Sequence, residues 1–214
     1  MNKGIKLKDF KHCLLILYVP VYLLSFFIIE QMVPETADYW VSYCFIDDLI
    51  PFEEIFIIPY YCWYPLLVIV GLWLMFRDVP MFKLYMYSIM IGFSVSVLIC
   101  LLFPNGQNLR PEVFPRDNFL TDMVKAIYAA DTNTNVIPSV HAVGAIIAAW
   151  GICTTKTVRS RWLKWLSASG SALICVSTCF VKQHSVLDVF AAMALCAVIY
   201  WIVYVVIRRN MKIE

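Results

Sequence analysis

The stretch that decides the fold is SVLDVFAAMALCAVIYWIVYVVI, residues 185–207. Its one charged residue is Asp188, close to the start. About 20 mostly apolar residues are enough for a helix to cross the hydrocarbon of a bilayer, so this stretch predicts a transmembrane helix. The residues directly before it, VKQH at 181–184, add a lysine and a histidine. Ionisable groups are costly in hydrocarbon, and their presence at the mouth of a spanning segment indicates a candidate functional site.

The rest of the chain has the same apolar character. Its 214 residues are 62% hydrophobic and 15% charged, with a mean hydropathy of +0.76, which excludes an ordinary soluble domain. No internal repeat or linker divides it, so residues 1–214 are predicted to form one all-α integral membrane domain with six transmembrane helices. The six apolar runs are roughly 13–30, 55–76, 84–103, 137–154, 164–181 and 185–207.

The distribution of basic residues predicts the orientation, because cytoplasmic segments of membrane proteins are enriched in Lys and Arg. With a cytoplasmic N-terminus, six crossings also leave the C-terminus in the cytoplasm. Thirteen of the 17 basic residues then lie on the cytoplasmic side, in segments 1–12, 77–83, 155–164 and 208–214. The short chain indicates a bacterial plasma membrane protein. No nucleic-acid partner is expected, since the basic residues are dispersed.

Two outer segments differ from simple loops. Residues 40–53 mix aromatic and aliphatic side chains with Asp47 and Asp48, which favours a short helix in the membrane interface. Residues 104–136 are polar and rich in Pro and Asn, and are expected to arch over the outer face. The eight cysteines lie mostly in apolar runs, and only Cys179 near His184 has a zinc-like spacing to an outer histidine, so no disulfide framework, metal or cofactor is predicted.

His184 and Asp188 form the first candidate pair. Residues four apart share one face of a helix. A carboxylate bonded to one imidazole nitrogen fixes the tautomer and leaves the other nitrogen as a nucleophile or base. The same pair also suits metal ligation. It also suits a purely structural role, as a hydrogen-bonded pair that holds two helices together.

The stretch PSVH, residues 138–141, supplies the second element. A helix that begins here would present the free amides of Ser139 and Val140, with the positive end of its dipole, as an anion site. The Ser139 hydroxyl adds a donor, and His141 is placed to give or take a proton. An ordinary helix start beside an interfacial histidine has the same sequence pattern.

Two cations complete the set at the same outer membrane level. Arg110 follows the third apolar run, and its guanidinium suits bidentate binding of phosphoryl oxygens. Lys182 precedes the sixth run. Either side chain is equally consistent with snorkelling to the interface. Together the residues are complementary to a phosphoryl group in transfer, whose charge spreads over its equatorial oxygens.

These motifs resemble the type 2 phosphatidic acid phosphatase superfamily. The family carries a Lys-to-Arg-Pro segment, a Pro-Ser-x-His segment, and a Ser-Arg segment that leads to His-x-x-x-Asp. Here they read Arg110-Pro111, PSVH at 138–141 and STCFVKQHSVLD at 177–188, so the motif-bearing part spans about 104–207. Phe103 stands where the family usually has its first lysine, and Thr178 where it has the arginine of its third motif. The sequence KQH at 182–184 is similar to the corresponding motif of the branch that includes inositol phosphorylceramide synthases.

The resemblance implies a metal-independent membrane lipid phosphatase that acts on a phosphatidate-like lipid or a prenyl diphosphate at the outer face. In that mechanism His184 attacks phosphorus, Asp188 orients His184, and His141 protonates the leaving oxygen. Arg110, Ser139 and Lys182 would hold the phosphoryl oxygens. The alternatives are a phosphotransferase with an alcohol acceptor, a small anion or lipid transporter without catalysis, and a metal hydrolase that uses both histidines and Asp188.

Overall fold

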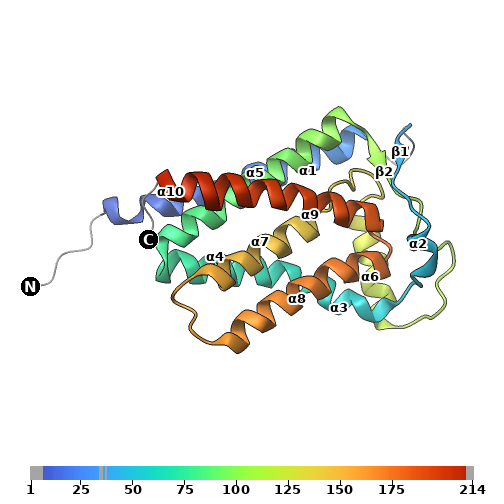
Figure 1. Ribbon diagram of the computed structural model, residues 1–214. Helices are drawn as coiled ribbons and strands as arrows, with labels where there is room; N and C mark the ends of the chain where they lie inside the picture. Colours follow the sequence, from blue (N-terminus) through green and yellow to red (C-terminus); the bar gives the residue numbers. More distant parts are fainter. Residues whose placement is uncertain (1–6, 34–35, 37, 211–214) are drawn as a thin grey trace, which may run out of the picture.

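The computed structural model describes residues 7–33, 36 and 38–210, and these residues are mostly helical (Figure 1). The predicted cytoplasmic ends, 1–12 and 208–214, therefore lie partly outside the described residues. The elements in chain order are η1 (Leu7–Leu17), α1 (Tyr18–Met32), β1 (Trp40–Val41), α2 (Ile46–Leu49), η2 (Glu54–Phe56), α3 (Ile57–Tyr61), α4 (Trp63–Arg77), α5 (Val79–Leu102), β2 (Asn105–Gly106), α6 (Phe119–Ala130), α7 (Val140–Thr154), α8 (Arg161–Phe180), α9 (Val186–Tyr200), η3 (Trp201–Ile207) and α10 (Arg208–Asn210).

Within the part of the chain that the structure describes, five helical segments are long and apolar enough to cross a membrane. They are Lys11–Met32, Glu54–Arg77, Val79–Leu102, Arg161–Phe180 and Val186–Ile207. The chain therefore has the architecture of an all-α, multi-pass membrane protein. The predicted run 137–154 corresponds to the shorter α7, which has 15 residues. At 1.5 Å per residue it extends about 22 Å, against about 30 Å of hydrocarbon, so the sixth crossing stays a prediction.

The short helix α7 occupies the centre of the bundle. It packs against α4, α5, α8 and α9, and most of its residues up to Gly151 are buried. Glycine and alanine let neighbouring helices approach closely, which is typical of packing inside membrane bundles. At Gly144, an added Cβ would lie only 2.8 Å from the Trp63 indole nitrogen. A central helix that contacts protein on several sides does not need the length of a lipid-facing helix.

Serine side chains fix where α7, α8 and α9 begin. Ser139, Ser160 and Ser185 each accept a hydrogen bond from a backbone amide in the first turn of the helix that follows. This capping satisfies amides that have no partner within the helix. At α9 the cap is reciprocal, because the Asp188 side chain accepts from the Ser185 amide. Two of these three caps lie within the predicted catalytic motifs.

The polar segments gather at one end of the bundle. β1, β2, α2 and α6 lie at this end, and α10 and the α7–α8 connection lie at the other (Figure 1). β1 pairs in parallel with β2, with Trp40 opposite Asn105 and Val41 opposite Gly106. The helix expected within residues 40–53 is the short α2. The segment 104–136 contains α6, an amphipathic helix that was not expected from the polar, Pro- and Asn-rich composition of this segment. Helix α6 packs against α3.

Candidate functional site

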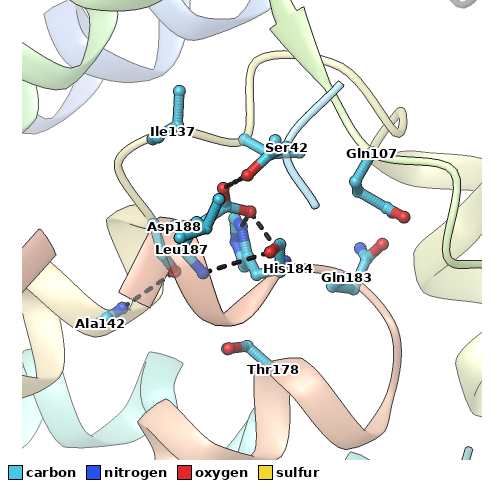
Figure 2. Close-up of polar contacts among 12 residues, drawn as sticks. Ser42, Gln107, Ile137, Ala142, Thr178, Gln183, His184, Leu187 and Asp188 are labelled. Carbon is cyan, nitrogen blue, oxygen red and sulfur yellow. Dashed lines mark hydrogen bonds and ion pairs between the residues drawn. The ribbon is translucent and has the colours of Figure 1, made fainter. Parts of the chain in front are cut away.

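His184 and Asp188 lie at the start of α9, where the capping geometry holds them together. Asp188 Oδ2 lies 3.2 Å from His184 Nδ1 and accepts a hydrogen bond from the Ser185 amide at 2.9 Å. The other carboxylate oxygen, Oδ1, accepts from the hydroxyl of Ser42, so Asp188 lies between Ser42 and His184 (Figure 2). Asp188 is completely buried, and His184 nearly so. With Nδ1 bonded to the carboxylate, Nε2 is the nitrogen left for chemistry.

His141 faces His184 from the first turn of α7. The two imidazole centroids are 5.8 Å apart. Aromatic rings enclose His141, with the Tyr60 and Trp63 rings each 4.5 Å away. The missing side chain of Gly144, one turn along α7, makes room for the Trp63 indole. His141 Nε2 is buried and has no hydrogen-bond partner among the described residues. A buried polar atom without a hydrogen-bond partner lowers the stability of the fold, and such an atom indicates a candidate ligand-binding group.

Ser139 is fully buried beside this pair. Its hydroxyl accepts from the Ala142 amide at 3.3 Å. The expectation of a free Ser139 amide is wrong, because this amide donates to the Asp188 carbonyl at 3.1 Å. The bond arises because the starts of α7 and α9 lie side by side, and it joins the two histidine-bearing segments. The backbone of Ser139 therefore connects the segment that carries His141 to the segment that carries His184.

Arg110 lies at the same end of the bundle, where it contacts Gln183, the residue before His184. Its guanidinium donates to the Gln183 side chain at 2.7 Å and to the Asp131 and Tyr128 carbonyls at 2.6 and 3.3 Å. It also stacks over the Tyr128 ring, 4.4 Å from its centroid. These contacts hold a permanent cation against Gln183, the residue before His184, and the role of Arg110 as a phosphate ligand stays a prediction.

Lys182 is placed differently from the phosphate ligand that the sequence predicted. Its ammonium donates to the carbonyls of Asp47 at 2.9 Å and Ile50 at 2.5 Å. Its backbone has a φ of 53°, a left-handed conformation that is uncommon for a residue other than glycine. Burial lowers the pKa of the ammonium. The described contacts make Lys182 a structural tie between α2 and the α8–α9 connection.

The two positions where the family usually has cations also have visible roles. Phe103 ends α5 and is about half exposed, with its ring 5.7 Å from that of Trp40. Thr178 is fully buried, and its carbonyl accepts from the amides of Gln183 and His184 at 3.0 and 3.2 Å. Neither residue brings a charge to the histidine pair. Among the described contacts, the guanidinium of Arg110 reaches Gln183, the residue before His184.

Several residues that complete the site were not singled out from the sequence. Asp47 caps α9 from outside, because it accepts from the Ser185 hydroxyl at 2.7 Å and the Val186 amide at 2.8 Å. Gln107 donates to the Lys182 carbonyl at 3.0 Å, on the connection that carries Gln183 and His184. Ser42 has no motif of its own. Only Asp47 carried a signal, as an acidic residue in an otherwise apolar outer segment.

Asp131 brings a carboxyl group to the edge of the site. Its Oδ2 accepts from Gln183 Nε2 at 3.4 Å. Burial, and then the negative charge of Glu30, raise the pKa of Asp131 to about 6, although His184 and Arg110 act in the opposite direction. A carboxyl group with such a pKa changes its charge near neutral pH, where it can donate or accept a hydrogen bond.

An apolar cavity lies beside two of the aromatic rings that pack around His141, although neither His141 nor His184 lines it. It has a volume of about 400 Å³ and lies between α1, α4 and α5, with Trp63 and Tyr64 in its lining. Both of these rings also contact His141. Within the described ranges, no three His, Cys, Asp or Glu side chains are grouped so that they share a metal ion. The residues of the metal-hydrolase alternative thus do not form a ligand set in this geometry.

Comparisons of this chain with protein-family models, with curated proteins and with solved structures found no match.

Proposed function

We propose that this chain is a membrane lipid phosphatase that works through a phosphohistidine at His184. The observation that carries the proposal is the buried His184–Asp188 pair, which faces a second imidazole at 5.8 Å. A hydrogen bond from Nδ1 to the carboxylate leaves His184 Nε2 with a free electron pair. A nucleophile activated by an oriented base is the usual requirement for covalent catalysis.

In the first step, His184 Nε2 forms a bond to phosphorus while the bond from phosphorus to the lipid oxygen breaks. His141 gives its proton to that oxygen, so the lipid leaves as an alcohol. A bound phosphate anion favours the protonated form of His141 at this moment. Asp188 stabilises the positive charge on the His184 ring, and Arg110 stabilises the charge on the phosphoryl oxygens.

In the second step, water attacks the phosphohistidine. His141, now neutral, takes a proton from this water as the oxygen–phosphorus bond forms and the bond to His184 Nε2 breaks. Inorganic phosphate leaves, and both histidines return to their starting state. The reaction balances without a metal ion or a redox partner, since each proton taken up in one step is released in the other.

The apolar cavity supports a lipid as the substrate. Its lining includes Trp63 and Tyr64, whose rings also contact His141, so a hydrocarbon chain in the cavity would lie one aromatic layer away from the histidine pair. We place the site on the extracytoplasmic face of a bacterial plasma membrane, with six crossings and both termini in the cytoplasm, because the basic residues favour that orientation.

A phosphotransferase is the second candidate, since Asp131 offers a hydrogen-bond acceptor to an alcohol near His184. Its carboxyl group lies against Gln183, one residue before His184. A carboxylate there accepts a hydrogen bond from an alcohol as readily as from water. The two functions share the phosphohistidine and differ only in what attacks it.

The test is phosphate release from a panel of phosphatidate and prenyl diphosphate lipids by the purified chain in nanodiscs with chelator present. His184→Ala is expected to abolish release. The matched control is His12→Ala, because His12 packs against Phe82 on α5, outside the histidine pair. Phosphate trapped on the wild type should be stable to base and labile to acid. Release that survives His184→Ala rejects the proposal. Added alcohols separate the candidates, because only a transferase forms a phosphorylated alcohol.

A further inference from the structure

The carboxylate of Asp188 is hydrogen-bonded on both oxygens. Oδ2 carries the contact with His184 Nδ1 and the bond from the Ser185 amide. Oδ1 accepts from the Ser42 hydroxyl. Ser42 and Asp188 are both completely buried. A hydroxyl that is buried against a charged carboxylate contributes more than a neutral hydrogen bond, because one of its partners is ionised.

Ser42 comes from a segment that is held firmly in place, the outer clasp, defined as residues 40–50. The Ser42 amide donates to the Gly106 carbonyl at 2.7 Å, directly after the β1–β2 pairing. At the other end of the clasp, Asp47 binds the Ser185 hydroxyl and the Val186 amide. The Lys182 ammonium also binds the clasp, by donating to the carbonyls of Asp47 and Ile50.

All these contacts converge on the turn that carries His184. The clasp touches residue 182 before the histidine and residues 185, 186 and 188 after it. Its own position depends on β2, so three parts of the chain that are far apart in sequence fix one imidazole. Such a shell of supporting hydrogen bonds is what holds a reacting group within a fraction of an ångström of its productive position.

We infer that Ser42 is a positioning residue for His184, acting through Asp188, in a hydrogen-bonded series Ser42–Asp188–His184. The inference rests on the proposed function, because it assigns Ser42 a role in making His184 an efficient nucleophile. The Ser42 hydroxyl orients the carboxylate so that Oδ2 faces Nδ1. It also withdraws negative charge from the carboxylate, which sets how strongly Asp188 holds the proton on the ring.

Removal of this hydroxyl has a defined electrostatic consequence. In Ser42→Ala, Oδ1 loses its donor, the carboxylate becomes a stronger base, and the protonated His184 ring is stabilised relative to the neutral ring. His184 must be neutral to attack, so activity at low pH should fall. The other ionisable groups around the pair stay in place: His141 from α7, Asp131 after α6, Asp47 from α2, Cys179 from α8, Cys100 from α5, and Lys182 and Arg110 from the connections.

The experiment is a histidine ring NMR titration of the full-length chain in nanodiscs, together with pH profiles of phosphate release. The chain has three histidines, so single His→Gln variants assign the signals. In Ser42→Ala, the His184 titration midpoint and the acidic limb of kcat/KM should both rise by about 0.5–1 pH unit. Ser42→Thr retains the hydroxyl and should stay within 0.2 unit of wild type, roughly the scatter expected when the hydrogen bond persists. Ser25→Ala is the matched control, because the Ser25 hydroxyl bonds only its own helix, at the Val21 carbonyl.

Two further comparisons keep the outcome decisive. In an Asp188→Asn background, Ser42→Ala should cause no additional change in the His184 titration, because Ser42 acts through the carboxylate. A residue that only supports the fold would shift both backgrounds. Ser42→Cys, with a weaker donor of similar size, should give an intermediate shift if the alanine variant does not fold. An unchanged His184 titration in Ser42→Ala or Ser42→Cys overturns the inference. If the wild type releases no phosphate but Ser42→Ala still shifts the His184 titration, the result supports the hydrogen-bonded series and rejects only the proposed function.

Discussion

The imidazole rings of His141 and His184 lie 5.8 Å apart, although one belongs to α7 and the other to the connection between α8 and α9. The Ser139 amide joins these segments by donating to the Asp188 carbonyl. Two rings at this separation can both contact one small phosphorylated group. Because only His184 has a carboxylate partner among the described residues, the two rings are expected to have different tasks.

The division of tasks predicts a dependence on the leaving group. His141→Gln should slow release from a lipid alcohol by about 10²–10⁴-fold, which is the usual contribution of a general acid. With a nitrophenyl phosphate, the loss in kcat/KM for nitrophenol release should be less than about tenfold, because this quantity reports the first step alone and that leaving group needs no proton. His184→Gln should abolish both reactions. Equal losses for the two substrates in His141→Gln would contradict the role of His141 as an acid.

The packing of Trp63 against His141 predicts the effect of a single methyl group. In Gly144→Ala, the new Cβ would lie 2.8 Å from the indole nitrogen, so Trp63 must shift against the His141 ring. Overpacking of this kind costs about 1–3 kcal/mol of stability. A displacement of about 1 Å at a catalytic group lowers the rate about 10²-fold. Thermal melts and kcat/KM measure the two effects.

Gly170→Ala is the matched control, because no atom lies within 4 Å of its added Cβ. Alanine at this helical position should raise stability by up to about 1 kcal/mol and leave kcat/KM unchanged. Full activity in a folded Gly144→Ala variant would show that the Trp63 contact does not position His141.

The positions of the long helices could be predicted from the sequence, because each of these helices corresponds to a continuous run of apolar residues. Residues 185–207 predict one helical segment, and the structure has α9 followed by η3 over Val186–Ile207. The spacing of His184 and Asp188 also predicted their contact, but His184 precedes the N-cap Ser185, so the capping of α9 brings the two side chains together and not a shared helix face. These are local relationships, in which composition and spacing over a few turns are sufficient.

The outer clasp could not be predicted in the same way. Ser42 meets Asp188 only because β1 pairs with β2 and Asp47 caps α9. Each of these contacts joins residues far apart in the chain, and a serine in a short strand has no periodic pattern to reveal it. Lys182 illustrates the same limit, because its contact with α2 depends on a left-handed backbone that no spacing rule indicates.

Lys182 gives a test that separates a structural cation from a phosphate ligand. Lys182→Met keeps the stem but removes the donor to the Asp47 and Ile50 carbonyls. Loss of these charge-assisted bonds should lower stability by about 1–3 kcal/mol. KM should change by less than about threefold, because the ammonium is already occupied. A rise in KM of more than about tenfold with an unchanged melting temperature would instead assign Lys182 to phosphate binding.

Arg110→Lys is the comparison for that variant. Lysine keeps the positive charge but cannot reproduce the planar fork that reaches Gln183 and the Asp131 carbonyl. We expect kcat/KM to fall by about 10–100-fold for every phosphorylated lipid, which corresponds to the loss of one bidentate interaction. An Arg110→Lys variant as active as the wild type would remove Arg110 from the proposed phosphate site.

The pKa of Asp131, raised from 3.8 to about 6, predicts how stability and substrate binding depend on pH. Because the folded state disfavours the ionised carboxyl, stability associated with this group is present below about pH 4 and is lost as the pH rises through 6. Asp131→Asn carries no such charge. Its melting temperature should therefore exceed that of the wild type at pH 7.5 by more than at pH 4.5.

The same charge affects the substrate. Above pH 6 the ionised Asp131 lies against Gln183, beside Arg110 and His184, and repels a phosphate anion at this site. Asp131→Asn should consequently lower KM for a phosphorylated lipid about 3–10-fold at pH 7.5, as one like charge at several ångströms implies at an intermediate dielectric, with little change at pH 5. If Asp131 instead binds an alcohol acceptor, the same variant loses transfer to added alcohols while hydrolysis persists. A KM ratio between Asp131→Asn and wild type that stays constant from pH 5 to 7.5 would show that the carboxylate does not act on the bound phosphate.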